Sequence, residues 1–185
     1  MYPEMVDRVQ FIVDGGATKR FHTVQTISQN TVAEHSFGTA MMVNLLMNGK
    51  ASKDLLWAAL IHDMAECETG DIPAPAKRLF GLRETMGDHE LCILTRVGFD
   101  MPELNAVEKY VLKVADCLDG ALFCAREHHF GNKNIDLPYK RFKSYIAELQ
   151  IPFSPGLRYY IDHEHVRSVI RAVIHLFERR SEVAL

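Results

Sequence analysis

Long stretches with a helical spacing of apolar residues, separated by short runs rich in glycine, proline and asparagine, dominate this chain of 185 residues. The first such stretch covers residues 3–13, and Gly15-Gly16 is expected to end it. No segment offers a convincing alternation of apolar and polar residues, the pattern typical of a half-buried strand. The pattern therefore predicts an all-α fold.

The helical spacing returns from Glu34 to Gly49, and again from a cap at Ser52 or Asp54 through Met64. Further helices are predicted over residues 83–97, 102–129, 139–149 and 156–182, with a structured turn at 69–81 and loops at 17–33 and 130–138. A loop as long as 17–33 is uncommon and usually functional. Without repeats or linkers, residues 1–185 are predicted to form one domain, a bundle of about six to seven helices.

Composition excludes several classes of function. A net charge of −3 disfavours binding to a nucleic-acid polymer or to an anionic membrane surface. No apolar run approaches the roughly 20 residues that span a bilayer, and the acidic start of the chain is not a secretory leader. The four cysteines are not in a CxxC spacing and are expected to be reduced and mostly buried. A cytoplasmic location is expected, which would be the host cytoplasm if a phage encodes the chain.

Six ionisable residues carry the chemical signal: His35, His62, Asp63, Glu66, Asp71 and Asp116. Adjacent residues on a helix diverge by about 100°, so His62 and Asp63 can contact one ion from two sides. Glu66 lies one turn further on the same face. His35 and Asp116 lie in apolar-rich stretches of other predicted helices, where a buried ionisable group needs a partner.

A shared metal ion would supply that partner. A lone histidine on an apolar helix face is more often a satisfied core residue, and an isolated His-Asp pair is weak evidence. The ordered set across separate helices favours a metal site, and mixed imidazole and carboxylate ligands suit a transition metal better than calcium. Asp119, one turn after Asp116, is expected to support a ligand or to form a salt bridge. Glu127-His128-His129 ends a predicted helix, and a second metal site there is disfavoured.

The segments AEHS, ALIHDMAE, TGDIPAPAK and VLKVADCLDG together resemble the HD-domain superfamily, in particular its compact 5'-deoxynucleotidases and phage deoxynucleoside triphosphohydrolases (dATPases). The resemblance runs from about Lys19 to Glu127. It implies a helical HD fold that binds one divalent transition metal (Zn, Co or Mn). The metal ligands that it implies are His35, His62, Asp63 and Asp116.

The resemblance also implies roles outside the ligand set. Glu66 would work on the attacking water, and Asp71 would line the substrate site. Arg20 matches the arginine that opens the substrate loop. Phe21 stands where the family often has tryptophan, and its phenyl ring offers no hydrogen-bond donor but can pack against a base or sugar.

Other residues are candidates for substrate contacts because they lie beside these motifs. Lys77 and Lys113, with Arg20, could neutralise charge that grows on phosphate. In the rigid segment TGDIPAPAK, Asp71 could accept a hydrogen bond from a sugar 3'-hydroxyl, while Ile72 and Pro75 offer apolar surface to a base. As simpler alternatives, Asp71 would be a helix cap and each cation a solvated surface residue.

Three functions remain open at this point. The favoured one is hydrolysis at the α-phosphorus of a deoxynucleoside triphosphate, with dATP suggested by the resemblance, to release deoxynucleoside and triphosphate. Arg78, beside Lys77, favours this substrate because it could reach the β- or γ-phosphate. The alternatives are a 5'-deoxynucleotidase and a non-catalytic nucleotide-binding scaffold, the last disfavoured by Glu66. By the same resemblance, a homo-oligomer (dimer or hexamer) is expected.

Overall fold

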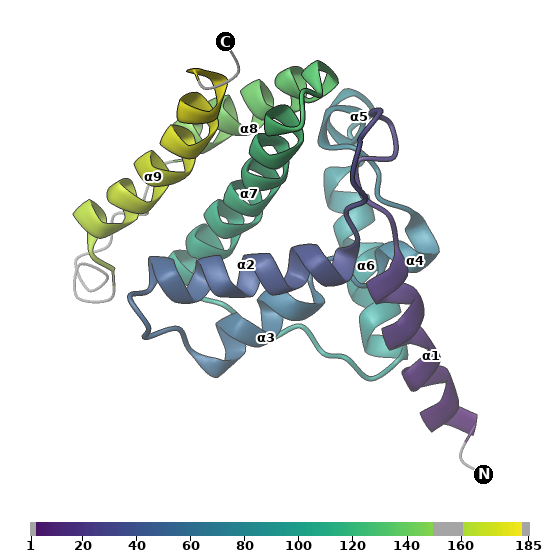
Figure 1. Ribbon diagram of the computed structural model, residues 1–185. Helices are drawn as coiled ribbons and strands as arrows, with labels where there is room; N and C mark the ends of the chain where they lie inside the picture. Colours follow the sequence, from purple (N-terminus) through teal and green to yellow (C-terminus); the bar gives the residue numbers. More distant parts are fainter. Residues whose placement is uncertain (1–2, 150–160, 183–185) are drawn as a thin grey trace.

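Helices joined by turns and loops make up residues 3–149 and 161–182, the part of the chain that the computed structural model describes (Figure 1). They are α1 (Pro3–Ala17), α2 (Val32–Leu46), α3 (Lys53–Ile61), α4 (Glu66–Thr69), α5 (Ala74–Leu79), α6 (Arg83–Arg96), α7 (Ala106–His129), a 3-10 turn (Lys133–Ile135), α8 (Asp136–Glu148) and α9 (His163–Glu182). Within this part, extended pairing is limited to one bridge between Lys19 and Thr31. The all-α prediction is confirmed.

Helix α7 is the axis of the fold, and it packs against α2, α8 and α9 (Figure 1). Its apolar residues Val107, Val111, Val114 and Leu118 follow a helical spacing and are buried. Asn105 caps its first turn by accepting hydrogen bonds from backbone amides, with Glu108 completing a capping box. A long helix that is buried on most sides can hold functional side chains in fixed positions.

Two apolar clusters hold the helices together. The larger joins α7 to α2, α3, α8 and α9. The smaller gathers Phe11 of α1, Leu94 of α6, and Ile61 and Ala65 from either end of the α3–α4 turn. That turn is therefore anchored on its apolar side, which fixes the polar residues between Ile61 and Glu66.

Several predicted boundaries need correction. Helix α1 continues through Gly15-Gly16 to Ala17, because helical glycine is only disfavoured by about 1 kcal/mol. The segment expected to be a turn at 69–81 contains helix α5, in which Pro73 is the N-cap and Pro75 lies in the first turn, where a proline is tolerated. The helices predicted from 102 and 139 begin at Ala106 and Asp136. Of the helix predicted over 156–182, residues 156–160 lie outside the described part.

The cysteines follow the expectation only in part. All four are free thiols, with Cys117 and Cys124 buried and Cys67 half-buried. Cys92 is exposed, because it lies on the outer side of α6. Among the described residues, no helix is both long and apolar enough to cross a membrane.

Candidate metal and phosphate site

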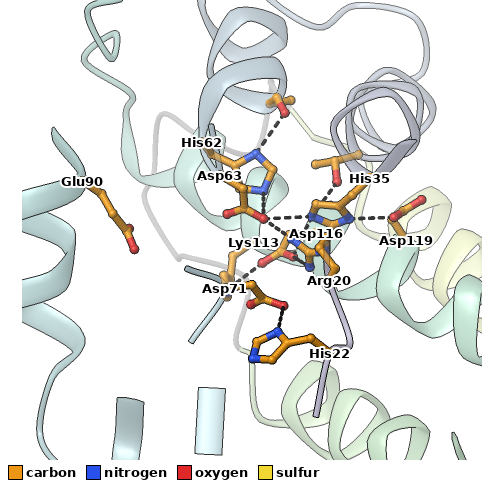
Figure 2. Close-up of polar contacts among 12 residues, drawn as sticks. Arg20, His22, His35, His62, Asp63, Asp71, Glu90, Lys113, Asp116 and Asp119 are labelled. Carbon is orange, nitrogen blue, oxygen red and sulfur yellow. Dashed lines mark hydrogen bonds and ion pairs between the residues drawn. The ribbon is translucent and has the colours of Figure 1, made fainter. Parts of the chain in front are cut away.

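Four ionisable side chains from three parts of the chain meet beside α7 (Figure 2). His35 comes from α2 and Asp116 from α7, while His62 and Asp63 lie in the turn between α3 and α4. One ligand atom each of His35, His62 and Asp116 lie within 4.8 Å of one another. The Oδ2 of Asp63 lies 3.5 Å from the Nε2 of both histidines. The structure thus brings together all four residues of the expected ligand set.

The turn between α3 and α4 differs from the continuous helix that was expected through Met64. Helix α3 ends at Ile61, and a turn follows until α4 begins at Glu66. The backbone at His62 remains in the α region, with its amide donating to Ala58 O at 3.0 Å. Adjacent side chains therefore still diverge as they would on a helix, although the helix itself has ended.

The ring of His62 is oriented so that one nitrogen remains available. Its Nδ1 lies 2.9 Å from the carbonyl oxygen of Ala59, which can only accept, so Nδ1 carries the proton. The Nε2 is buried and has no hydrogen-bond partner among the described residues. Burial also lowers the pKa of His62, which keeps the ring neutral. A buried lone pair that faces carboxylates and a second imidazole fits a metal ligand.

His35 is held from its opposite side by a carboxylate. Its Nδ1 lies 2.7 Å from the Oδ2 of Asp119, while its Nε2 lies 3.3 Å from Oδ1 of Asp116. Asp119 comes this close because α2 has a glycine at its nearest point: a Cβ on Gly38 would lie 1.9 Å from Asp119 Oδ1. An outer carboxylate of this kind fixes the orientation of a metal-binding imidazole. Asp119 was expected either to support a ligand or to form a salt bridge. Its contact with His35 matches the first of these expectations.

Two cations share the carboxylates of the cluster (Figure 2). The buried Arg20 forms a salt bridge with Asp63, and its Nη2 lies 3.9 Å from Asp116 Oδ1. The Nζ of Lys113 lies 2.6 Å from Asp116 Oδ2. Burial alone would raise the pKa of Asp63, but the positive charges of Arg20 and His35 outweigh it and lower the pKa to about 2. Both carboxylates are therefore ionised at neutral pH.

Glu66 stands apart from this pairing. It opens α4, is buried, and its Oε2 has no hydrogen-bond partner among the described residues. Burial, followed by the negative charges of Asp63 and Asp71, raises the pKa of Glu66 to about 9. A carboxyl group whose pKa lies this far above its usual range can hold a proton at neutral pH. Such groups are typical of proton-transfer sites.

Arg20 reaches the cluster from the long loop between α1 and α2. The loop closes on itself where the Arg20 amide donates to Asn30 O at 2.9 Å and the Val32 amide donates to Thr18 O at 2.9 Å. Phe21 has a φ of 56°, a left-handed conformation that a bulky residue rarely adopts. Its ring packs against Phe123 with centroids 4.5 Å apart. Part of the Phe21 ring is thus already used to hold the loop on α7.

The remaining predicted substrate residues lie on the segment after α4. Asp71 is half-buried and faces His22 of the loop, with 3.8 Å between Oδ2 and Nδ1. Ile72 is also half-buried, whereas Pro75 and Arg78 of α5 are exposed. Lys77 forms an ion pair with Glu90 of α6 at 3.1 Å.

Sequence reasoning missed His22 and Glu90. His22 directly follows the Arg20-Phe21 pair, and that position was the signal that could have drawn attention to it. Glu90 gave no signal, because its contact with Lys77 depends on how α5 folds back on α6.

The donor set fits one divalent transition metal. Two imidazoles and two carboxylates match the ligand types that Zn, Mn, Fe and Co accept, whereas calcium prefers an all-oxygen shell. The unpartnered Nε2 of His62 is the observation of this structure that supports the fit. Two histidines and two aspartates that could hold a metal ion therefore lie together in a helical fold, with a buried glutamate on the adjoining helix α4.

Comparison with known proteins indicates a family for this chain. Residues 17–90 match the family model described as an HD domain, a range that contains His35, His62, Asp63 and Glu66. Together with the relatives described next, this match supports an HD-domain phosphohydrolase.

Two curated relatives are named 5'-deoxynucleotidase. The protein from Shewanella oneidensis is 25% identical over 167 residues, which cover 78% of this chain and 84% of the relative. The protein from Vibrio vulnificus is 24% identical over 157 residues, which cover 72% of this chain and 81% of the relative.

Solved structures share the fold at lower identity. A protein from Pyrococcus horikoshii has a TM-score of 0.68 at 22% identity, covering 93% of this chain and 99% of its own. The HD phosphohydrolase DatZ of cyanophage S-2L, bound to dA and one catalytic Zn²⁺ ion, has a TM-score of 0.67 at 18% identity and covers 92% of this chain and 96% of its own.

Binding of a divalent metal at pH 7 is expected to release about one proton from His35, and up to one more from Glu66 where the ion ionises it. Burial lowers the pKa of His35, but its contacts with Asp116 and Asp119 outweigh burial and raise the pKa to about 9. Below that pH, a metal must displace this proton. Apparent affinity should therefore fall at least about tenfold for each pH unit lost between pH 8 and 6. Calorimetric titration in two buffers of different ionisation enthalpy measures the proton count, and zero protons at pH 7 would contradict the expectation.

Proposed function

We propose that the protein cleaves the bond between the α-phosphorus and the 5'-oxygen of a deoxynucleoside triphosphate, with dATP as the first substrate to test. The observation that carries the proposal is the cluster of His35, His62, Asp63 and Asp116 beside Glu66. Among the described residues, the buried His62 Nε2 and Glu66 Oε2 have no hydrogen-bond partner. Released products would be deoxyadenosine and triphosphate.

The four clustered side chains would hold the metal, with His62 and His35 each offering Nε2. A divalent metal held there supplies Lewis-acid activation of water and of the phosphoryl oxygens. The proposed ion is zinc, cobalt or manganese. The DatZ structure contains Zn²⁺. The carboxylates of Asp63 and Asp116 would then bind the ion as well as the neighbouring Arg20 and Lys113.

Glu66 is proposed to move the proton that hydrolysis requires. At neutral pH and without a nearby cation it holds a proton, because its pKa is about 9. A divalent cation beside Asp63 would favour the ionised form. Oε2 could then take a proton from the attacking water and return it to the departing 5'-oxygen. Its burial keeps bulk water from competing for that proton.

Cationic side chains are proposed to bind the phosphates. Arg20 would turn from Asp63 towards the α-phosphate, and Lys113 lies beside the same ligands. Lys77 would act from α5, where its pairing with Glu90 limits its motion. A guanidinium offers two parallel donors to a phosphate, which fixes geometry as well as charge.

The nucleoside is proposed to lie against the segment after α4. Asp71 would accept a hydrogen bond from the 3'-hydroxyl, with Ile72 and Pro75 beside the base. The dA bound by DatZ supports an adenine nucleoside as the first ligand to test. Phe21 would present the edge of its ring that Phe123 leaves free.

The length of the phosphate chain separates two candidate substrates. Arg78 is exposed on α5, next to Lys77, and is placed to attract a β- or γ-phosphate. The names of the curated relatives favour a deoxynucleoside monophosphate instead. Both substrates lose the same bond, so the site chemistry is common to them.

Product analysis decides between these substrates. Purified protein with Co²⁺, Mn²⁺ or Zn²⁺ is given dATP or dAMP separately, and products are separated by chromatography. Deoxyadenosine and triphosphate from dATP would support the proposal. Phosphate from dAMP, with dATP untouched, would make the protein a 5'-deoxynucleotidase and refute the role of Arg78. The other three deoxynucleoside triphosphates then define base selectivity.

A further inference from the structure

A buried carboxylate far from the metal cluster is bound to the loop that carries Arg20. Glu127, near the end of α7, is fully buried. It accepts hydrogen bonds from the backbone amides of Ile27 at 2.6 Å and Ser28 at 2.8 Å, and also from the Ser28 hydroxyl. Burial alone would raise the pKa of Glu127, but these donors and Asn132 outweigh it and lower the pKa. Glu127 is therefore an ionised group held by protein donors.

Asn132 makes the same connection from the segment after α7. Its Nδ2 donates to Glu127 Oε2 and to the carbonyl oxygen of Gln25, each at 2.9 Å. One side chain thus binds both the carboxylate and the loop that the carboxylate holds. The loop backbone at Gln25, Ile27 and Ser28 is fixed to one end of α7 over a sequence separation of about 100 residues.

The fixed part of the loop is linked to Arg20 through backbone pairing. Asn30, two residues after Ser28, accepts a hydrogen bond from the Arg20 amide at 2.9 Å. On the other arm, Phe21 packs against Phe123, which lies one helical turn before Glu127 on α7. Helix α7 therefore holds both arms of the loop, and between these two contacts the backbone around Arg20 has little freedom to shift.

We propose that Glu127 is a positioning residue for this loop: its buried carboxylate fixes the backbone at Ile27 and Ser28, and thereby holds Arg20 in place beside the metal ligands. Glu127 is not part of the cluster that could hold the metal. The inference rests on the proposed function only for the role of Arg20 in binding phosphate. Preorganised cations lose less freedom when the phosphate binds, and a displacement of about 1 Å can cost up to a hundredfold in rate.

The test is Glu127→Gln, which keeps the shape of the side chain but turns an NH2 group towards backbone amides that can only donate. Amide hydrogen exchange of the metal-loaded protein should become at least about tenfold faster at Ile27 and Ser28, while α2 and the core of α7 keep their protection. The value of kcat/KM should fall about tenfold to a hundredfold. Metal affinity should stay unchanged, which a general loss of folding would not allow.

Glu108→Gln is the matched control, because it makes the same change at the opposite end of α7, where a glutamine still suits the capping box. It should leave loop exchange and kcat/KM unchanged. If Glu127→Gln does not fold, Asn132→Ala and Ser28→Ala can replace it, because each removes a single side-chain donor to Glu127. Both should speed up amide exchange at the same loop positions, but by a smaller factor.

Unchanged exchange at Ile27 and Ser28, or an equal loss of protection throughout α2 and α7, would overturn the inference. If the unmodified protein hydrolyses no deoxynucleotide, the proposed function fails by itself. Hydrogen exchange then still decides whether Glu127 holds the loop.

Discussion

Glu66→Gln is expected to lower kcat by about a thousandfold, since proton transfer by a positioned side chain contributes roughly 10²–10⁴-fold. The carboxamide has nearly the shape of the carboxyl group, but it cannot take up a proton and return it. Metal content should not change, because the clustered ligand atoms belong to His35, His62 and Asp116, with Asp63 beside them. Single-turnover kinetics and metal analysis of the same sample measure the two properties separately.

Folding of this variant should be at least as good as that of the unmodified protein. The burial of an unpaired carboxyl group is costly, and Glu66 Oε2 has no partner among the described residues. Glu68→Gln is the matched control on the same short helix, because Glu68 is exposed and pairs with Arg96. Near-normal turnover in Glu66→Gln, or an equal loss in Glu68→Gln, would refute the role given to Glu66.

The fold was predictable to the extent that apolar periodicity determines it. Helix α7 has strong apolar spacing, so its existence followed from the sequence, although its start was placed at 102 and not at Ala106. Helix α5 did not follow, because prolines and glycines around it suggest a turn, while Pro75 in fact suits a first helical turn. The end of α1 was misplaced for a related reason: α1 packs against α2 and α4, and this packing outweighs the weak helical preference of Gly15-Gly16.

The four expected ligands came from the resemblance to HD-domain proteins, and their imidazole and carboxylate groups are types that can share a transition metal. The environment of those ligands was harder to predict, since it depends on contacts across the fold. Asp119 could be placed one turn from Asp116, but its contact with His35 depends on how α2 crosses α7. The position of Glu127 at the end of a helix gave no indication of its loop contacts.

Gly38→Ala is expected to weaken metal binding about tenfold to a hundredfold, the range typical of outer-shell changes, without lowering stability. The new Cβ would lie 1.9 Å from Asp119 Oδ1, so the two atoms cannot keep their positions. Only the end of the Asp119 side chain would meet the new methyl group at position 38, so the Asp119 carboxylate can rotate away from it. That rotation removes the hydrogen bond that orients His35. Cobalt titration followed by visible absorption measures affinity, and thermal unfolding measures stability.

Stability should change little, because the preference of a helix for alanine over glycine, about 1 kcal/mol, offsets the lost contact between Asp119 and His35. Gly87→Ala in α6 is the control, since a Cβ there meets nothing within 4 Å and only the helical gain remains. Asp119→Ala should reproduce the affinity loss of Gly38→Ala. In the Asp119→Ala background, Gly38→Ala should then cost no further affinity, because the carboxylate that it displaces is already gone. Additive losses in this double-mutant cycle would show that Gly38 acts on the site by another route.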